Sequence, residues 1–187
     1  MGPVVTINSA SLMNKGLEII EAHHLFDIPY SRIEAVIHPQ SFVHSMVEFV
    51  DGSTIAQASP PNMKGPISLA LNYPHRVPSA TKPIDWSNLH TWTFVPIDSK
   101  RFPAVALARS CGEAGGALPA IFNAANEIAV QAFIDSQINF AGIIDIVTSV
   151  VDALRASALK HLRDIEDVSA AEEDARRTAR ELLKKVG

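Results

Sequence analysis

Five prolines divide this chain of 187 residues into two parts; they are Pro74, Pro78, Pro83, Pro96 and Pro103. Proline lacks a backbone N–H, and its ring clashes with the preceding helical turn, so no continuous helix can run through this stretch. Trp86, Trp92 and Phe94 lie among the prolines, which indicates that the stretch packs against protein. We therefore expect a connecting arm over residues 73–103 between two folded bodies.

The first body, residues 1–72, opens with a β-branched run at residues 4–7 that predicts a buried strand. Ser9 and Ser11 follow and are typical N-cap residues. Residues 12–26 predict a helix that ends at the turn 27–29. The residues expected on its apolar face are Met13, Leu17, Ile20 and Leu25.

A β-hairpin is the clearest supersecondary signal in the first body. Two strand-like runs span residues 44–59 and are joined around Asp51-Gly52, a dipeptide preferred in hairpin turns. Residues 35–37 predict one further short strand. Together these runs predict a small, mostly antiparallel or mixed sheet with helices.

The second body, residues 104–187, is predicted to be all helical. Apolar residues recur at helical spacing from Ile143 to Leu154, which is typical of a buried helix face. Residues 169–172 (SAAE) form a capping box and predict the start of the last helix there. The predicted fold class is therefore α+β, with a small sheet-and-helix body followed by a helical bundle.

Composition excludes several classes of protein. Lys and Arg number 16 against 20 Asp and Glu, so the chain has no basic surface for nucleic acid. No apolar run approaches the roughly 18 residues of a membrane helix. The single cysteine, Cys111, cannot form an intrachain disulfide and is expected to pack in the core. We expect a cytoplasmic protein with neither nucleic-acid nor membrane partners.

The densest polar cluster lies in residues 6–18, around the predicted start of the first helix. Unpaired N–H groups at a helix start favour anions, and Lys15 and Asn14 add a positive charge and a donor. Glu18 lies four residues beyond Asn14 on the same face, where it could ligate a hard cation. From the spacing alone, an N-capped helix with a Lys15–Glu18 surface pair is the favoured interpretation, because such pairs are common and weak.

Other candidate residues carry weaker signals. His38 ends a strand, where a site or a structural histidine would be found. Met63 lies in a proline-containing loop that would cover a ligand or simply face solvent. Glu21 and His24 form a Glu-x-x-His unit without a second copy, so a metal enzyme built on them is improbable.

Five segments, in this order along the chain, closely resemble 1-deoxy-D-xylulose 5-phosphate reductoisomerase. They are TINSASLMNKGLE (6–18), HPQSFVHSM (38–46), GSTIAQASPPNMKGPISLAL (52–71), RFPAVALA (101–108) and NAANEIAVQAF (123–133). The resemblance covers nearly the whole chain, and its first motif is highly specific. It therefore favours the functional interpretation of that motif over a simple surface pair.

The resemblance implies roles for individual residues in the first motif. Ser9, Asn14 and Lys15 match the family's ligands for the substrate's phosphate and hydroxyl groups. Glu18 matches a carboxylate ligand of the catalytic metal, which is Mg or Mn. Lys15 and Glu18 are therefore expected to act in catalysis, together with His38.

The loop 60–64 resembles the family's contact with NADPH. Pro61 and Met63 match residues at the nicotinamide end of that cofactor. Asn62 stands where many members carry aspartate.

The resemblance also implies an activity. The family rearranges a phosphorylated ketose to a branched aldehyde and reduces it with NADPH to 2-C-methyl-D-erythritol 4-phosphate, in non-mevalonate isoprenoid biosynthesis. Its members are homodimers, and the hairpin 44–59 is expected to pair across the two-fold axis.

The family's dinucleotide-binding domain and its other metal carboxylates precede the motif that here begins at residue 6. We therefore expect this chain to correspond to the C-terminal half of the enzyme and to be inactive alone. The alternative function is a non-catalytic homodimerisation module.

Overall fold

The computed structural model describes residues 2–186 and divides the chain into two compact units. The helical unit contains the residues up to Ala35 and those from Ile97 onward, and the hairpin unit is Val36–Pro96. These units differ from the predicted ranges 1–72, 73–103 and 104–187. The reason is that the residues before Val36 share one hydrophobic core with the C-terminal helices.

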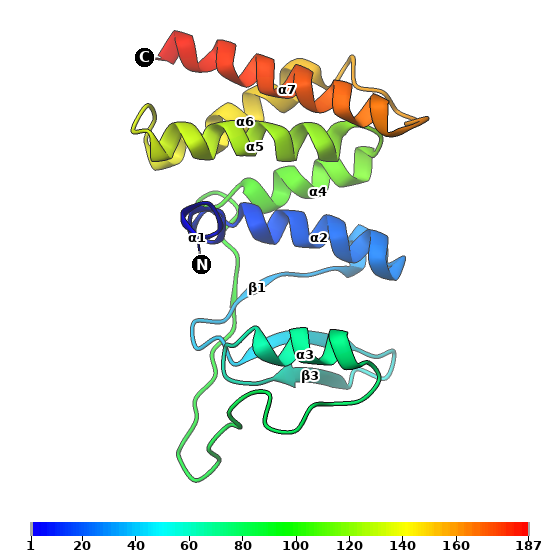
Figure 1. Ribbon diagram of the computed structural model, residues 1–187, viewed down its shortest axis with the longest axis vertical. Helices are drawn as coiled ribbons and strands as arrows, with labels where there is room; N and C mark the ends of the chain where they lie inside the picture. The colour runs from blue at the N-terminus through cyan, green and yellow to red at the C-terminus, as the bar shows by residue number, and fades with distance from the viewer. Residues whose placement is uncertain (1, 187) are drawn as a thin grey trace. The chain divides into compact units, whose positions relative to one another are not determined.

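The helical unit is built around the central helix α5 (Figure 1). Its helices are α1 (Pro3–Ala10), α2 (Met13–Phe26), the 3-10 turn η1 (Tyr30–Arg32), α4 (Ala104–Ala114), α5 (Leu118–Ile134), α6 (Phe140–Leu154) and α7 (Ile165–Val186). Helix α5 packs against α4, α6, α7 and α1, and α2 packs against α4. Beyond Pro103 every regular element of the described chain is a helix, as predicted.

Small side chains on α5 let its neighbours approach closely. Ala124, Ala125 and Ala129 are completely buried, and Phe122 fills the space between the helices without any solvent exposure. Burying a phenylalanine side chain of this kind stabilises the fold by roughly 1.5–3 kcal/mol. The unit therefore has a dense core with α5 at its centre.

The strand predicted at residues 4–7 is wrong, because this segment forms α1. Pro3 occupies the first turn, where its fixed φ suits a helix and its missing N–H costs nothing. In the helix, Ile7 packs on the core while Val4 and Val5 remain exposed. Tertiary contact through one side of the segment thus overrides the β preference of its residues.

The predicted helix 12–26 is confirmed as α2, but its buried face differs from the prediction. Met13 and Ile20 are buried as expected, Leu17 is half-buried, and Leu25 is 75% exposed. Gly16 is buried against α4, where small residues bring the two backbones together. Asp27 ends the helix in a left-handed conformation.

The α6 prediction is confirmed, since the face from Ile143 to Val151 is buried and Leu154 packs against it.

Helix α7 begins at Ile165, four residues before the predicted capping box, so the predicted start of the last helix is wrong. Its start is stabilised by Asp164, whose Oδ1 accepts from the backbone N–H of Asp167 at 3.0 Å. Hydrogen bonds from Arg163, including one from Nη2 at 2.6 Å, lower the pKa of Asp167 to about 2.

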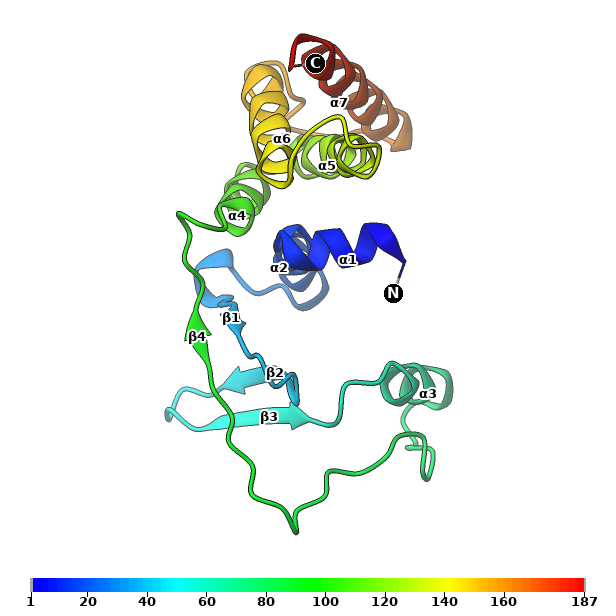
Figure 2. The same cartoon turned by 90° about the vertical axis from the view of Figure 1, so that its left-hand side faces the viewer.

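The hairpin unit contains the predicted hairpin as β2 (Val43–Glu48) and β3 (Thr54–Ala58), which pair antiparallel and lie side by side in Figure 2. Its loop is longer than a two-residue turn: the Phe49 N–H donates to the Ser53 carbonyl, and Gly52 has a φ of 83°. A left-handed glycine at this position is typical of three-residue hairpin loops.

Two further elements complete the hairpin unit. The predicted strand 35–37 is confirmed as β1 (Val36–Ile37), which pairs antiparallel with β4 (Val95–Pro96). Helix α3 (Lys64–Asn72) follows the hairpin. The α+β class is therefore confirmed.

The proline-rich stretch contains no helix between Tyr73 and Phe102. Instead, its aromatic side chains join others near β1 in one cluster that consists of His38, Phe42, Trp86, His90, Trp92 and Phe94. The closest pair is His38 and Phe94, whose rings stack with centroids 4.5 Å apart. The aromatic cluster explains how a stretch without helix packs in this unit.

Among residues 2–186, no helix combines the length and the apolar composition that crossing a membrane requires.

The contact between α2 and α4 predicts the effect of one added methyl group. A Cβ at Gly16 would lie 2.7 Å from the Ala108 Cβ and 3.3 Å from the Ala104 carbonyl oxygen. We expect Gly16→Ala to lower the free energy of unfolding by about 1–3 kcal/mol in chemical denaturation, since overpacking forces helices apart.

The direction of the change in unfolding free energy tests the close contact. Without that contact, alanine would stabilise the helix relative to glycine by about 1 kcal/mol. The double variant Gly16→Ala/Ala108→Gly removes the nearest opposing atom and should recover part of the loss. A single variant more stable than the wild type would show that the helices are not in close contact.

Candidate functional site

Three of the predicted site residues lie together on the first turns of α2. Asn14 Nδ2 donates to Glu18 Oε1 at 2.6 Å, and Lys15 Nζ forms an ion pair with Glu18 Oε2. The Lys15 and Glu18 side chains are each about two-fifths exposed. An ion pair this accessible contributes roughly 0–1 kcal/mol to stability, so exchanging it for ligand contacts costs little.

The serines before α2 do not cap it, so the predicted N-cap chemistry is wrong. Within α1, Ser9 Oγ donates to the Val5 carbonyl at 2.8 Å. At the C-cap of α1, Ser11 Oγ donates to the Ile7 carbonyl at 2.9 Å. The N-cap of α2 is Leu12, which has a left-handed backbone and no side-chain cap. Both serines therefore bond back along α1.

Residues 8–15, which comprise the end of α1, the two connecting residues and the start of α2, are called the α1–α2 corner below. Here the backbone reverses through Leu12, and the first helical bond of α2 runs from the Gly16 N–H to the Leu12 carbonyl at 3.0 Å. The N–H groups of Met13, Asn14 and Lys15 precede this bond and form the positive end of the helix dipole. The corner thus retains the anion-favouring character expected of a helix start.

His38 uses both ring nitrogens inside the hairpin unit. The Phe42 N–H donates to Nε2 at 3.1 Å, so Nδ1 carries the proton that is donated to the Thr93 carbonyl at 2.9 Å. Gln40 reinforces the same link, since its Oε1 accepts from the Thr93 N–H. In this state His38 joins the end of β1 to the proline-rich stretch, and its catalytic role stays a prediction.

The loop before α3 leaves Pro61 and Met63 exposed, with Met63 at 68%. Asn62 Oδ1 accepts from the Lys64 N–H at 2.9 Å and fixes the turn into the helix. An aspartate carboxylate would accept the same bond, so asparagine at this position preserves the loop's local support. Met63 is an adaptable apolar side chain that is free to contact a ligand.

No group of three or more His, Cys, Asp or Glu side chains within residues 2–186 is arranged to hold a metal ion. The site at α2 therefore offers one carboxylate, Glu18. Glu21 and His24 of the Glu-x-x-His unit belong to no such group either. The neighbouring His23 has a structural role, since it stacks on Tyr30 at 4.2 Å and hydrogen-bonds the Ile28 carbonyl.

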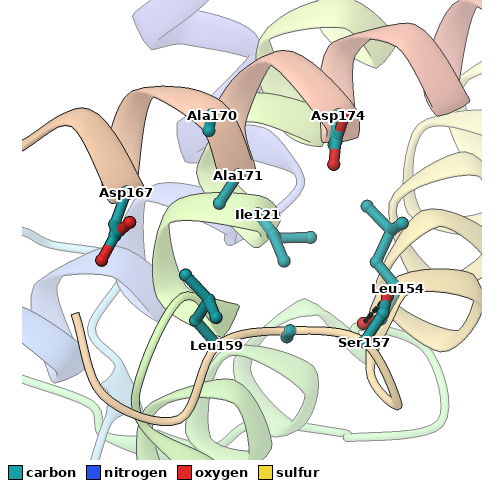
Figure 3. Close-up of a pocket in the computed structure, with 9 residues that line it drawn as sticks. Ile121, Leu154, Ser157, Leu159, Asp167, Ala170, Ala171 and Asp174 are labelled. Atoms are coloured by element: carbon teal, nitrogen blue, oxygen red, sulfur yellow. Dashed lines mark hydrogen bonds between the residues drawn. The ribbon is translucent and has the colours of Figure 1, made fainter. Parts of the chain in front are cut away.

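Two small cavities of about 110 Å³ lie in the helical unit. Figure 3 shows the first, between α5, α6 and α7, with the carboxylates of Asp167 and Asp174 at its side. It contains none of the predicted site residues. The second is lined by Ser11, Arg101 and Phe140, among others, and so lies next to the α1–α2 corner.

A buried amide on α5 forms a hydrogen bond to the first helix. Asn126 Nδ2 donates to Asn8 Oδ1 at 3.1 Å, from α5 to α1. The sequence did not predict that Asn126 contacts Asn8, the residue before Ser9. No local pattern indicates a contact between residues 118 positions apart.

Comparison with known proteins follows the same segments. A family model described as "DXP reductoisomerase C-terminal domain" matches residues 58–178, and "1-deoxy-D-xylulose 5-phosphate reductoisomerase C-terminal domain" matches residues 1–26. The first match covers more than half of the chain. The chain belongs to the 1-deoxy-D-xylulose 5-phosphate reductoisomerase family.

Curated reductoisomerases match nearly the whole chain. That of Kitasatospora griseola is 58% identical over 182 residues, which are 97% of this chain and 47% of the relative. That of Leifsonia xyli subsp. xyli is 64% identical over 153 residues, covering 82% and 42%. The chain therefore spans about half the length of the relatives that it matches.

Solved reductoisomerase structures are similar in fold. The enzyme of Zymomonas mobilis in complex with NADPH has a TM-score of 0.90 at 44% identity, covering 96% of this chain and 47% of its own. A reductoisomerase in complex with NADPH, fosmidomycin and magnesium has a TM-score of 0.93 at 39% identity, covering 98% and 47%.

Cys111 lies outside the reductoisomerase motifs quoted above and, as predicted, packs in the core. Burial raises the pKa of its thiol to about 11, against an ordinary value near 9. A raised pKa keeps the thiol protonated at neutral and mildly alkaline pH, and only the thiolate is nucleophilic.

We expect Cys111 to react with a disulfide reagent at pH 8 at least about 100-fold more slowly in the folded chain than in denaturant, because burial adds to the low thiolate fraction. The free-thiol rate measured in denaturant is the control. Equal rates in both states would show that the thiol is accessible and ionised in the folded protein.

Proposed function

We propose that this chain provides the substrate-phosphate side of the active site of a 1-deoxy-D-xylulose 5-phosphate reductoisomerase. The observation that carries this proposal is the grouping of Asn14, Lys15 and Glu18 at the start of α2. These residues lie within the family match to residues 1–26.

The proposed substrate is a phosphorylated ketose, held by its phosphate at the α1–α2 corner. Lys15 supplies a charge, Asn14 an amide donor, and the start of α2 its unpaired N–H groups. Ser9 has an exposed hydroxyl whose oxygen can accept a further hydrogen bond. Anchoring the remote phosphate lets its binding energy align the reacting carbonyl end.

A divalent cation fits this chain through Glu18 alone. Its side chain is about two-fifths exposed, and its present partners are Lys15 and Asn14. Mg²⁺ or Mn²⁺ generally needs further carboxylates or substrate oxygens. Residues 2–186 do not group further carboxylates around Glu18 into a metal site. When bound, such a cation polarises carbonyl and hydroxyl oxygens. Glu18 would orient it and offset its charge.

NADPH is the proposed hydride donor, with Pro61 and Met63 as its contacts in this chain. Both are exposed in the loop before α3, and the solved relatives include complexes with NADPH. The chain contains no Gly-x-Gly-x-x-Gly turn, so most of the cofactor's contacts would come from elsewhere in the enzyme. We therefore propose that the chain alone is inactive. We also propose that the protein is cytoplasmic, as expected from its sequence.

A homodimer formed through the hairpin is also proposed, and the non-catalytic module remains the alternative function. Val47 and Ile55 are direct cross-strand partners, and both are about three-fifths exposed. Phe49 is also exposed. An apolar strand pair left open to water favours association with another sheet surface.

A chimera tests the catalytic proposal: the N-terminal half of the Kitasatospora griseola reductoisomerase is joined to this chain. We expect NADPH oxidation with 1-deoxy-D-xylulose 5-phosphate and Mg²⁺ by the chimera, and none by the chain alone. Glu18→Gln should lower kcat/KM by about 100-fold or more, since it removes a metal ligand. Lys15→Ala should mainly raise KM for the phosphorylated substrate.

The matched control is Glu21→Gln, which changes an exposed carboxylate on the same helix and should leave turnover unchanged. Turnover by the chain alone above a protein-free blank, or full activity of the Glu18→Gln chimera, would overturn the proposal.

Light scattering of the chain tests the dimer. We expect a dimer mass that persists over a roughly hundredfold dilution, and a monomer for Ile55→Asp, because a charge in an apolar interface is strongly unfavourable. Leu25→Asp, which alters an exposed apolar side chain in the helical unit, should remain dimeric. A monomer for the unmodified chain at all concentrations contradicts the dimer.

A further inference from the structure

We propose that Asn126 is a positioning residue for the substrate site. Its carboxamide holds the α1–α2 corner, which carries Ser9 on one side and Asn14 and Lys15 on the other. This inference rests on the proposed function, because it assigns Asn126 to the same site.

The contact that carries the proposal is a single hydrogen bond from the central helix. Asn126 is 2% exposed, and its Nδ2 donates to Asn8 Oδ1 at 3.1 Å. Asn8 immediately precedes Ser9. Because a hydrogen bond is directional, this one restricts how α1 rotates about its axis, and with it the direction of Ser9.

The α1–α2 corner needs such an anchor on its α1 side. Helix α1 has no fully buried residue, whereas α2 is held through Met13 and its other buried residues. Between them, Leu12 has a φ of 60° and a ψ of 15°, a left-handed conformation that a leucine rarely adopts. Such a conformation persists only where its surroundings enforce it.

The amide at Asn126 is unfavourable for packing alone. Its Oδ1 is buried and has no hydrogen-bond partner among the described residues, which costs free energy. Its neighbours along α5, Ala125 and Ala129, are completely buried apolar residues. Leucine, which is similar in shape, would suit this environment better, so the bond to Asn8 is the distinct contribution of the amide.

Hydrogen exchange in the chain itself tests the anchoring. We expect Asn126→Leu to leave the melting temperature unchanged or higher, while amides of residues 8–15 exchange about tenfold faster, as expected for loss of one buried hydrogen bond. Asn123→Leu removes a neighbouring amide that bonds only within α5 and should change neither quantity. Unchanged exchange at the corner overturns the proposal, and so does a lower melting temperature with faster exchange throughout the unit.

Kinetics of the chimera test the link to the substrate. Asn126→Leu should raise KM for 1-deoxy-D-xylulose 5-phosphate about fivefold, with KM for NADPH unchanged. Asn8→Ala should have the same effect, and the double variant should be no worse than either single variant, because both remove one bond.

An unchanged substrate KM in an active Asn126→Leu chimera, or additive effects of the two substitutions, would overturn the positioning role. A chimera that is inactive without any substitution refutes the proposed function instead. The exchange measurement then still decides whether Asn126 anchors the corner.

Discussion

The packing of α2 on α4 is the contact on which the candidate site depends. The polar side of α2 carries Asn14, Lys15 and Glu18, and its opposite side is buried against a helix about 90 residues later in the chain. Gly16 makes this possible, because its missing side chain lets the α4 backbone come close. The buried face of α2 therefore fixes the orientation of the polar side chains on its opposite face.

A second set of contacts ties the end of the α2 segment to α4. Arg109 donates to the backbone carbonyls of Tyr30 and Ile33, with the Nη2 bond to Ile33 at 2.6 Å. The Tyr30 carbonyl also accepts from the Ile33 N–H at 3.1 Å within η1, and the Ile33 carbonyl lies just after this turn. A guanidinium with several donors suits two such acceptors at once. Helix α2 is therefore fixed through its buried face and through the turn that follows it.

Local sequence patterns correctly predicted the elements that have a regular apolar spacing or a characteristic turn sequence. The helix at 12–26, the hairpin around Asp51-Gly52 and the buried face of α6 all follow from spacing and turn chemistry. The same reasoning failed at residues 4–7, where β-branched residues form a helix that packs through Ile7. It also placed the start of α7 too late, because Asp164 provides a cap without a typical capping-box sequence.

The candidate site was identified by its residues, but only part of its geometry could be predicted from them. The grouping of Asn14, Lys15 and Glu18 follows from helical spacing alone. The partners of His38 and Asn8 lie 55 and 118 positions away, at Thr93 and Asn126. Such contacts are set by the tertiary fold, so only the structure reveals them.

The distance between Asn8 and Asn126 along the chain also sets the order in which the molecule can be completed during synthesis. The α1–α2 corner leaves the ribosome before its anchor on α5, which emerges 118 residues later. At ordinary translation rates this delay is on the order of 10 s, far longer than helix formation requires. For most of that interval the apolar face of α2 has neither α4 nor α5 to cover it. The α1–α2 corner therefore reaches its final form only after α5 has emerged, although its own residues are synthesised long before.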